Sequence, residues 1–567
     1  MVIGHLLLMP ACKNCQSTFT IYPEDRAFYG RIGVPEPTWC PPCREMRRWA
    51  YRNTKTLYPR KCDLCQKDII SVYPAGSSYT VYCPDCWYSD KWDDRAFGRD
   101  FDFNQPFFSQ FAELQKAVPR MSNYNRNSVN CDYCNAAVES KNCYLLFSCR
   151  AEDCYYGYKV IDSRDCVDNL GINNCELCYQ SVDCIRCFNV AFSRYTYDSR
   201  DSAFLYNCSN CHDCFLSANL KNQEYCFLNQ RLSPAEYEKK IADWRSGSYL
   251  ATQKYLAEFA KLKSNTFHRY AEIQGSTNCS GDNIHNSKNC FHCFDLGGGN
   301  GDRYFSDSSL HTSDCMDSIV GSIDNELIYE NLSTITGYQI LFGTYCWSAN
   351  FLHYCDQMLG GGSYCFGCVG LKKGKYAIFN KQYTESEYRK LSGKIIEHMK
   401  KTGEWGEFFP VELSPFAYNE TSAIDEFPLT KEEVLQKGWR WKDDLPGVFG
   451  KETLTPKDLP DKISEVDDKI LEEVLACVDC GRNYKIVKAE LKFYQKQSLP
   501  LPRQCFDCRY LGRLKQRNPH RLWRRQCMCE NAEHNHQNRC SNEFETSYAP
   551  DRPEKVYCEE CYRKEIY

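Results

Sequence analysis

Long apolar runs and the common signatures of enzymes are both missing from this 567-residue chain. No stretch approaches the roughly 18 consecutive apolar residues of a membrane-spanning helix. The start, M-V-I-G-H-L-L-L-M-P-A-C, lacks the cationic region and cleavage site of a secretory signal, so we expect no signal peptide. No P-loop, dinucleotide fingerprint, Ser-His-Asp order or H-E-x-x-H occurs, and only 11 histidines are present. We therefore expect a protein that is not an enzyme.

A large excess of either charge is also missing. The net charge is −4, so the chain as a whole is not the polybasic type that binds nucleic acid, and any basic surface must be local. The length exceeds what one hydrophobic core supports, which predicts several domains.

Cysteine, by contrast, is abundant, with 39 residues. The number is odd, and the chain is far longer than a disulfide-stapled secreted domain. These features favour a cytoplasmic protein that uses cysteine to bind metal, while a secreted disulfide protein stays open as an alternative.

Paired C-x2-C motifs stand at both ends of the chain. C-K-N-C and C-P-P-C are followed by C-D-L-C and C-P-D-C, the spacing that tetrahedral zinc sites with four thiolate ligands need. The first five of these cysteines recur 465 positions later and the last three 475 positions later, so the C-terminal module duplicates the N-terminal one. The sequence thus predicts about four structural zinc ions. Their ligands are Cys12, Cys15, Cys40 and Cys43; Cys62, Cys65, Cys83 and Cys86; Cys477, Cys480, Cys505 and Cys508; and Cys527, Cys540, Cys558 and Cys561.

The change of offset places a ten-residue insertion, rich in His and Asn, between Cys527 and Cys540. It carries Cys529, His534 and His536. We interpret it as a solvated loop, with an additional ligand set as the alternative.

The motifs C-K-N-C, F-T-I-Y-P-E-D-R-A-F-Y and P-x-x-C-P-P-C-R resemble the zinc-ribbon (treble-clef-like) family of bacterial proteins. Segments such as G-E-W-G-E-F-F-P-V-E-L-S-P-F-A-Y-N-E-T extend the resemblance to uncharacterised multi-zinc-ribbon proteins of candidate-phylum bacteria. The resemblance implies a metal-binding fold and no established activity.

Arginines follow the second knuckle of each module with the spacing of one helix face, i, i+4 and i+8. Like charges in a row favour an anion opposite them, and the planar guanidinium suits phosphate. Trp49, Tyr51, Tyr58 and Trp523 offer stacking surfaces. We therefore expect the arginines to bind RNA or a ribonucleoprotein. The candidates are Arg44, Arg47, Arg48, Arg52, Arg60, Arg509, Arg513, Arg517, Arg521 and Arg525.

An alternative is that the stripes are neutralised within the molecule by the acidic segment Asp458 to Glu473. Trp49 and Tyr58 then cover a small zinc-module core. The competing function is a protein-assembly scaffold that binds a protein partner on the flank of the β-solenoid predicted for the middle of the chain.

Between the modules, cysteine-containing units recur about every twelve residues, with short β-branched or aromatic stretches between polar turns. This pattern predicts a β-solenoid. The array is itself duplicated, because D-C-V-D at Asp165 recurs as D-C-M-D at Asp314. The copies do not preserve their C-x2-C pairs as sets, so we interpret the 22 middle cysteines as buried ladders rather than metal ligands.

A solenoid also suits a polysaccharide-degrading enzyme, the least favoured alternative. Its acidic groove would use Asp153, Asp165, Asp183, Asp302 and Asp314, which sit where turns prefer Asp and Asn.

The predicted fold is therefore multidomain: two zinc modules flank a duplicated cysteine-rich β-solenoid, with helical connectors. Within the connectors, helices are expected in Gln230 to Ile273, in Glu385 to Lys401 and, as an acidic amphipathic helix, in Leu459 to Leu475. The predicted domains are residues 1–121, 122–232, 233–275, 276–382, 383–475 and 476–567.

Overall fold

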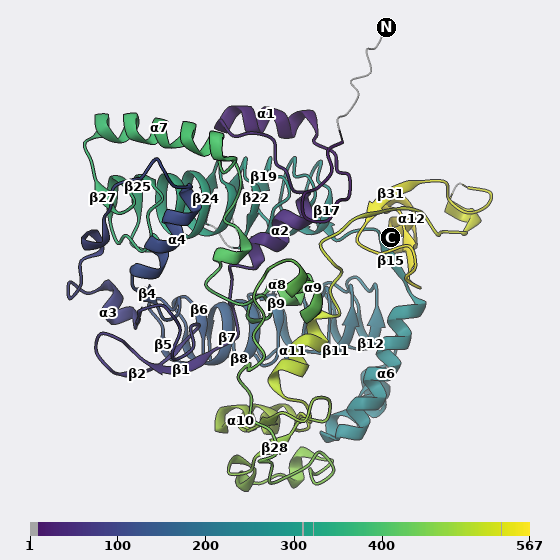
Figure 1. The fold of residues 1–567 in the computed structure, drawn as a ribbon. Helices are drawn as coiled ribbons and strands as arrows, with labels where there is room; N and C mark the ends of the chain where they lie inside the picture. The colour runs from purple at the N-terminus through teal and green to yellow at the C-terminus, as the bar shows by residue number, and fades with distance from the viewer. Residues whose placement is uncertain (1–8, 309–310, 321–322, 535, 567) are drawn as a thin grey trace.

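The computed structural model describes residues 9–308, 311–320, 323–534 and 536–566. The first eight residues, on which the signal-peptide expectation falls, and the last residue of the C-terminal module lie outside them. Two arrays of parallel strands lie side by side, and the segments from the two chain ends pack around them (Figure 1). Here the first array denotes residues 126–231 and the second array residues 273–382.

The first array is built from parallel strands whose partners stand about twelve residues apart, as in Val129 with Lys141 and Arg200 with His212. Single parallel bridges, such as Arg164 with Glu176, connect its two sheets. Its strands are β5 (Val129–Asp132), β6 (Asn135–Ala137), β7 (Lys141–Glu152), β8 (Tyr155–Arg164), β9 (Leu170–Asn173), β10 (Phe188–Ala191), β11 (Arg200–Tyr206), β12 (His212–Ala218), β13 (Glu224–Phe227) and β14 (Gln230–Arg231).

The second array repeats the pattern, with Gly281 beside Cys293 and Met316 beside Tyr329. Its strands are β16 (Ile273–Gln274), β17 (Gly281–His285), β18 (Cys293–Gly297), β19 (Gly299–Asn300), β20 (Ser306–Ser308), β21 (Thr312–Ser313), β22 (Met316–Ile319), β23 (Asp324–Glu326), β24 (Tyr329–Asp356), β25 (Gly362–Phe366), β26 (Gly374–Ile378) and β27 (Lys381–Gln382).

The backbone of the first array turns at every third residue, because a positive φ recurs at that interval from Asp153 to Leu228. Asn and Asp adopt this left-handed conformation most readily among non-glycine residues. A cysteine follows several of them, as in Asp165-Cys166 and Asn174-Cys175. The repeated Asp-Cys and Asn-Cys pairs therefore combine a turn with a small residue that points inward.

The middle cysteines fill the interior of the arrays. Of the 22, only Cys131 and Cys279 are half-buried, and the other 20 are buried. Their thiols donate hydrogen bonds to carbonyl oxygens of their own repeat and of the next repeat. Cys166 Sγ, for example, donates to the carbonyl oxygen of Arg164 at 3.1 Å and to that of Cys175 at 3.6 Å. This packing agrees with the interpretation as buried ladders.

The N-terminal module (residues 9–121) consists of short elements around its cysteine pairs. These are α1 (Pro23–Ile32), α2 (Pro41–Trp49), β1 (Tyr58–Lys61), β2 (Asp68–Ser71), β3 (Val81–Tyr82), α3 (Pro84–Tyr88), η1 (Asp94–Phe97), α4 (Phe107–Ala117) and β4 (Arg120–Met121).

The C-terminal module (residues 475–566) repeats the order from α1 to α3, with two helices, two paired strands, a third strand and a helix. It contains β28 (Leu475–Ala476), β29 (Asn483–Tyr484), α10 (Lys488–Gln497), α11 (Phe506–Leu514), β30 (Trp523–Gln526), η7 (Ala532–His534), β31 (Glu543–Thr546), β32 (Lys555–Tyr557) and α12 (Glu559–Ile566).

Helices fill the two predicted connectors that follow the arrays. They are α5 (Pro234–Ile241), η2 (Trp244–Ser246) and α6 (Tyr249–Asn265), then α7 (Glu385–Thr402), η3 (Val411–Leu413), η4 (Tyr418–Glu420), α8 (Ala423–Glu426) and α9 (Lys431–Gln436). Both α5 and α7 begin with the expected capping box, Ser233 with Glu236 and Thr384 with Glu387. Near the end of the first connector, β15 (Phe267–Arg269) pairs with β32. In the described residues no helix combines the length and apolarity needed to cross a bilayer.

The prediction of an amphipathic helix in Leu459 to Leu475 is wrong. This segment forms two single 3₁₀ turns, η5 (Ile463–Glu465) and η6 (Asp468–Leu471), separated by extended backbone at Val466. Asp467 caps η6 by accepting a bond from the N–H of Lys469, which competes with a continuous helix. Ile463 and Ile470 are nevertheless buried, so the apolar pattern marked a packing face and not a helix.

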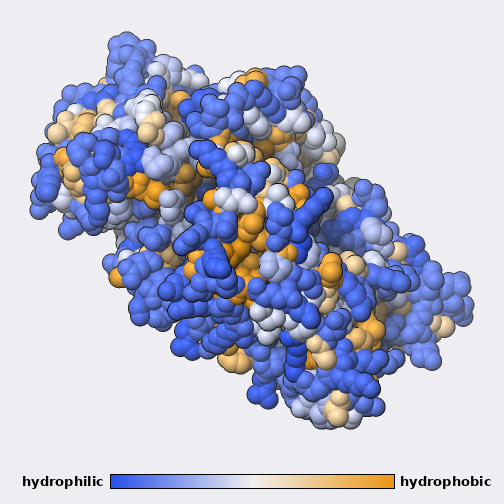
Figure 2. Space-filling model, turned by 90° about the horizontal axis from the view of Figure 1, so that it is seen from below, coloured by the Kyte–Doolittle hydropathy of each residue, from blue (hydrophilic) through white to orange (hydrophobic). Residues whose placement is uncertain are grey.

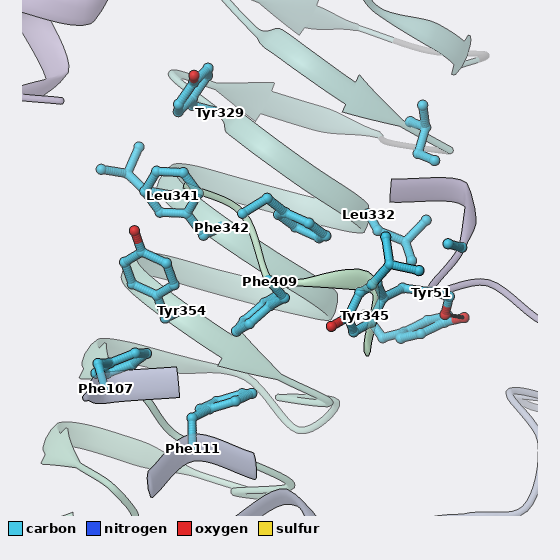
Figure 3. Close-up of a cluster of buried hydrophobic side chains, with 14 of the residues drawn as sticks. Tyr51, Phe107, Phe111, Tyr329, Leu332, Leu341, Phe342, Tyr345, Tyr354 and Phe409 are labelled. Carbon is cyan, nitrogen blue, oxygen red and sulfur yellow. Dashed lines mark hydrogen bonds between the residues drawn. The ribbon is translucent and has the colours of Figure 1, made fainter. Parts of the chain in front are cut away.

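Aromatic side chains on the outer face of the second array form its contact with the N-terminal module (Figure 3). Phe342 stacks on Tyr354 with ring centres 4.4 Å apart, and Phe111 of α4 stacks on Phe409 at 4.8 Å. Helices α1, α2 and α4 of the N-terminal module thus pack on the second array, although the first array follows the module directly in the sequence. Residues 57–81 of the same module pack on the first array. The C-terminal module packs on the first array in the same crossed manner.

Because Asn174 has a φ of 52°, the β-branched variant Asn174→Val should lower the free energy of unfolding by about 1–2 kcal/mol. The matched variant Asn174→Gly should stay within about 0.5 kcal/mol of the wild type. Denaturant unfolding of both variants measures the difference. Equal stabilities of the two variants would contradict a role of left-handed residues in shaping the array.

Candidate metal centres and buried arginine clusters

All sixteen predicted ligands come together as the four predicted groups, and in each group the sulfur atoms lie within 4.8 Å of one another. In every group the second cysteine pair stands at the start of a helix. Cys40 caps α2 and Cys83 caps α3, and the same holds at α11 and α12. The fourth group contains Cys540 and not Cys529, as the duplication predicts.

The sulfur spacing suits a tetrahedral ion. Sγ atoms are 3.7 Å apart between Cys15 and Cys40 and 3.9 Å apart between Cys65 and Cys83. Bonds of about 2.3 Å to a central zinc place sulfur ligands roughly 3.8 Å apart. A disulfide would need about 2.05 Å, and all 39 cysteines are free.

Backbone N–H groups stabilise the thiolate form, which is the form that binds metal. Burial favours the neutral thiol of Cys62, but N–H groups including those of Cys65 and Cys83 outweigh it and lower the pKa to about 7. The same balance, with the N–H groups of Cys505 and Cys480, lowers the pKa of Cys477 to about 7. Each group supplies four protein ligands, so an ion bound there would have no open coordination position, as in structural metal sites.

The inserted loop of the fourth site is solvated only in part, because Glu530 and Gln537 to Arg539 are exposed while two of its candidate ligands are not. Cys529 is fully buried and His534 is 7% exposed. Together with His536 and Cys561 they form a fifth group whose ligand atoms also lie within 4.8 Å of one another. The alternative of an additional ligand set is therefore the one that the geometry supports.

The arginine stripe of α2 points into the molecule. Arg44, Arg47 and Arg48 are at most 4% exposed. They surround two fully buried carboxylates of the second array, Asp317 of β22 and Glu330 of β24. Arg44 lies 2.8 Å from Asp317, and Arg47 and Arg48 lie 2.9 and 2.8 Å from Glu330.

Electrostatics in this cluster keep Glu330 charged. Burial favours its neutral form, but Arg47, Arg48 and Arg44 outweigh burial and hold the pKa of Glu330 below its usual value. Asp317 raises the pKa of Arg44 well above normal despite the opposing effect of burial. Charges of opposite sign thus compensate each other inside this buried cluster.

The C-terminal module forms the corresponding cluster with the first array. Arg513 lies 2.9 Å from Asp168, and Arg509 lies 3.2 Å from Asp168 and 3.5 Å from Glu490. Arg509 and Arg513 repeat Arg44 and Arg48, and Asp168 of D-C-V-D repeats Asp317 of D-C-M-D. The same ion pair therefore joins each module to its array.

The remaining arginine candidates divide between internal and exposed positions. Arg52 is buried and donates to Ser148 of β7 at 2.8 Å. Arg517 pairs with Asp183 and, at 3.1 Å, with Asp295, so it connects the two arrays. Of the other three, Arg60 and Arg525 are half-buried and Arg521 is exposed.

An exposed phosphate-binding stripe is thus the wrong interpretation for Arg44, Arg47, Arg48, Arg52, Arg509 and Arg513, because a buried, paired guanidinium is not accessible to RNA. Neutralisation within the molecule is what the structure shows. The partners differ from those expected, since none of the ion pairs of these arginines in the described ranges involves the acidic segment 458–473. Trp49, Tyr51 and Tyr58 are buried as core residues.

The modules and arrays meet at a polar centre. His520 of the C-terminal module lies 2.8 Å from Glu45 of α2 and 3.3 Å from Asp295 of β18. Burial lowers the pKa of His520, but Glu45 and Asp295 outweigh burial and raise it well above normal. A cavity of 530 Å³ beside this centre is lined by groups of both arrays, including Lys159 and Asp295, and by Arg517 of the C-terminal module.

The five aspartates of the enzyme alternative lie in different surroundings. Asp183 pairs with Arg517, and Asp314 lies 3.1 Å from Arg31 of α1. Asp302 is fully buried, and burial raises its pKa to about 8. Asp153 and Asp165 occupy left-handed turn positions.

The carboxylates that receive the arginines were missed in the sequence. A signal was present, because Asp168 and Asp317 occupy the same place in the duplicated D-C-V-D and D-C-M-D motifs, just as the arginines occupy the same place in the two modules. The modules and the arrays are both duplicated, so equivalent arginines of the two modules are expected to pair with equivalent aspartates of the two arrays.

No protein-family model and no curated protein matches this chain.

Arg48 is fully buried against Glu330, so Arg48→Met should lower the free energy of unfolding by about 3–5 kcal/mol, because it leaves a buried carboxylate short of its partner. Arg513→Met should have a similar effect at Asp168. The exposed control Arg521→Met should stay within about 0.5 kcal/mol. Denaturant unfolding measures all three, and equal stability of the Arg48 and Arg521 variants would refute the clusters.

Proposed function

We propose that this chain is a non-enzymatic, zinc-stabilised assembly scaffold whose two arrays coil as β-solenoids of about twelve residues per turn. The recurrence of positive φ at every third residue and the parallel partners twelve residues apart support this coiling. The crossed ion-pair clusters join modules and arrays into one body. Four closed groups of four cysteines favour zinc, which stabilises a fold without supplying an open coordination position.

An open sheet edge carries the assembly proposal. In the described residues β5 pairs with β7 alone, so one edge of β5 is open. Val129, the first residue of β5, is 60% exposed, and Tyr133, which follows the strand, is 43% exposed. The opposite end of each array is covered by an antiparallel strand and a helix, β14 with α5 and β27 with α7. Proteins usually cover or charge such edges, because unpaired N–H and C=O groups recruit another strand.

The surroundings of β5 suit a second copy of the same chain. A groove of about 1270 Å³ separates β5 from the second zinc site, and its lining carries both signs of charge, Lys61, Lys67 and Arg126 with Asp85 and Asp132. A two-fold axis brings the same surface of each copy together, so that surface must carry both positive and negative charges to be complementary to itself. The two-fold axis also makes the two β5 strands antiparallel, which allows them to pair.

Much of the rest of the surface is polar. Figure 2 shows a face covered mostly by hydrophilic side chains, with hydrophobic ones gathered in its central part. Isolated exposed hydrophobic residues elsewhere on the arrays, such as Phe188 at 43% exposure, are ordinary for a protein surface and provide a matched control for the edge.

The purified full chain should be dimeric, with twice the mass of one chain in sedimentation equilibrium. The variant Val129→Lys with Tyr133→Lys should be monomeric, because lysines on the edge oppose strand pairing. Its far-UV circular dichroism and metal content should equal those of the wild type, which shows that the monomer keeps its fold.

The control Phe188→Lys should stay dimeric. A wild-type chain that is monomeric at all concentrations, or a dimer that survives the lysine pair, would eliminate assembly through β5.

RNA binding is the second candidate, and it now rests on a smaller surface. Arg521 and Arg524 are exposed on either side of the half-buried Trp523, and the Arg521 guanidinium lies 5.1 Å from the Trp523 ring centre. Cations next to an aromatic ring are a common arrangement for holding single-stranded RNA.

If this surface binds RNA, Arg521→Glu with Arg524→Glu should weaken retention of single-stranded RNA about tenfold and reduce its dependence on salt. Substituting Arg48 or Arg513 would not test this, since loss of the buried pairs changes the fold. The exposed control Arg231→Glu with Arg245→Glu should leave retention unchanged. Retention that is equal in all three proteins would remove the RNA candidate.

A further inference from the structure

The inserted loop folds back onto the fourth cysteine group. The N–H of Cys540 donates to the carbonyl oxygen of Cys529 at 2.9 Å, and Arg539 donates to that of Cys527 at 2.8 Å. These bonds carry Cys529 and η7 toward Cys561, near the start of α12. Cys561 therefore belongs to two groups at once, one with Cys527, Cys540 and Cys558 and one with Cys529, His534 and His536.

The ligand spacing of the second group suits its own tetrahedral ion. Cys561 Sγ lies 3.6 Å from His536 Nε2, and Cys529 Sγ lies 3.2 Å from His534 Nδ1. Zinc bonds of about 2.3 Å to sulfur and 2.0–2.1 Å to nitrogen place such ligands roughly 3.6 Å apart. The first distance matches this value, and the second is somewhat shorter.

The outward nitrogen of one imidazole has the partner expected of a metal-binding histidine. His536 Nδ1 donates to the carbonyl oxygen of Asn538 at 2.5 Å, which fixes the ring and its tautomer and leaves Nε2 free to bind metal. His534 Nε2 lies 3.8 Å from the carboxylate of Glu565 and 3.3 Å from the amide nitrogen of Asn531.

We infer that the fourth site is a dinuclear zinc centre in which the Cys561 thiolate bridges two ions. Charge supports two ions over one. Four thiolates with one Zn²⁺ carry a net charge of −2, while five thiolates and two neutral imidazoles with two Zn²⁺ carry −1. The second ion thus halves the negative charge of a largely buried site.

The duplicated module provides an internal comparison. The second site, with Cys62, Cys65, Cys83 and Cys86, lacks the insertion and has no group of the second kind among the described residues. The inference therefore concerns the insertion alone, and it is independent of assembly through β5. Its structural effect is to fasten the inserted loop to α12.

The full chain, purified under reducing conditions, should contain about five zinc ions by elemental analysis. The variant His534→Ala with His536→Ala should contain about four. The control His292→Ala with His311→Ala, outside all five groups, should keep five. Four ions in the wild type, or an unchanged count in the His534 and His536 variant, would overturn the second ion.

The bridge itself is tested on the wild-type chain loaded with ¹¹³Cd. A shared thiolate should produce two cadmium resonances that are scalar-coupled to each other through Cys561. Two bound ions without this coupling would show separate sites and overturn the shared ligand. Because this measurement needs no substitution, it holds even where a histidine variant fails to fold.

Discussion

The structure depends on burying arginine charge at the contact between modules and arrays. Burying a guanidinium is costly unless a carboxylate compensates its charge, and Arg48 and Arg513 are both at most 1% exposed. Glu330 and Asp168 compensate them from the outer faces of the two arrays. A module therefore fits on its array in the one position where all these charges meet, which gives a chain of small units a defined arrangement.

Metal groups and ion pairs have complementary roles in this arrangement. The cysteine groups hold α2 and α11 at fixed angles, since Cys40 and Cys505 stand at the helix starts, and the arginines of the same helices then reach the arrays. The arrays in turn depend on residues that tolerate left-handed backbone and on cysteines small enough for their interior. The cysteine groups, the salt bridges and the turn residues thus depend on one another, and loss of one weakens the next.

The crossed connectivity explains how two duplications produce one body. Helices α1, α2 and α4 of the N-terminal module pack on the second array and the C-terminal module packs on the first, so neither half of the chain contains a complete unit. Arg517 and His520 close the centre by joining Asp183, Asp295 and Glu45. A chain closed in this way presents few surfaces for a partner, which is why the open edge at β5 and the exposed Arg521 carry the functional proposals.

The sequence by itself determined what depends on neighbours along the chain. The C-x2-C spacings identified three cysteine groups, because one tight turn supplies both thiolates of a pair, and the duplication of the module identified Cys540 as the partner of Cys527 in the fourth. Ser233 and Thr384 marked helix starts through local bonds. Tertiary structure alone decided what the arginines contact. Arg48 and Glu330 are 282 residues apart, and a charged stripe looks the same in the sequence whether its counter-charge comes from RNA or from a distant strand. Helical spacing fixes which side chains share a face, whereas only the packing of that face decides between water and a buried carboxylate.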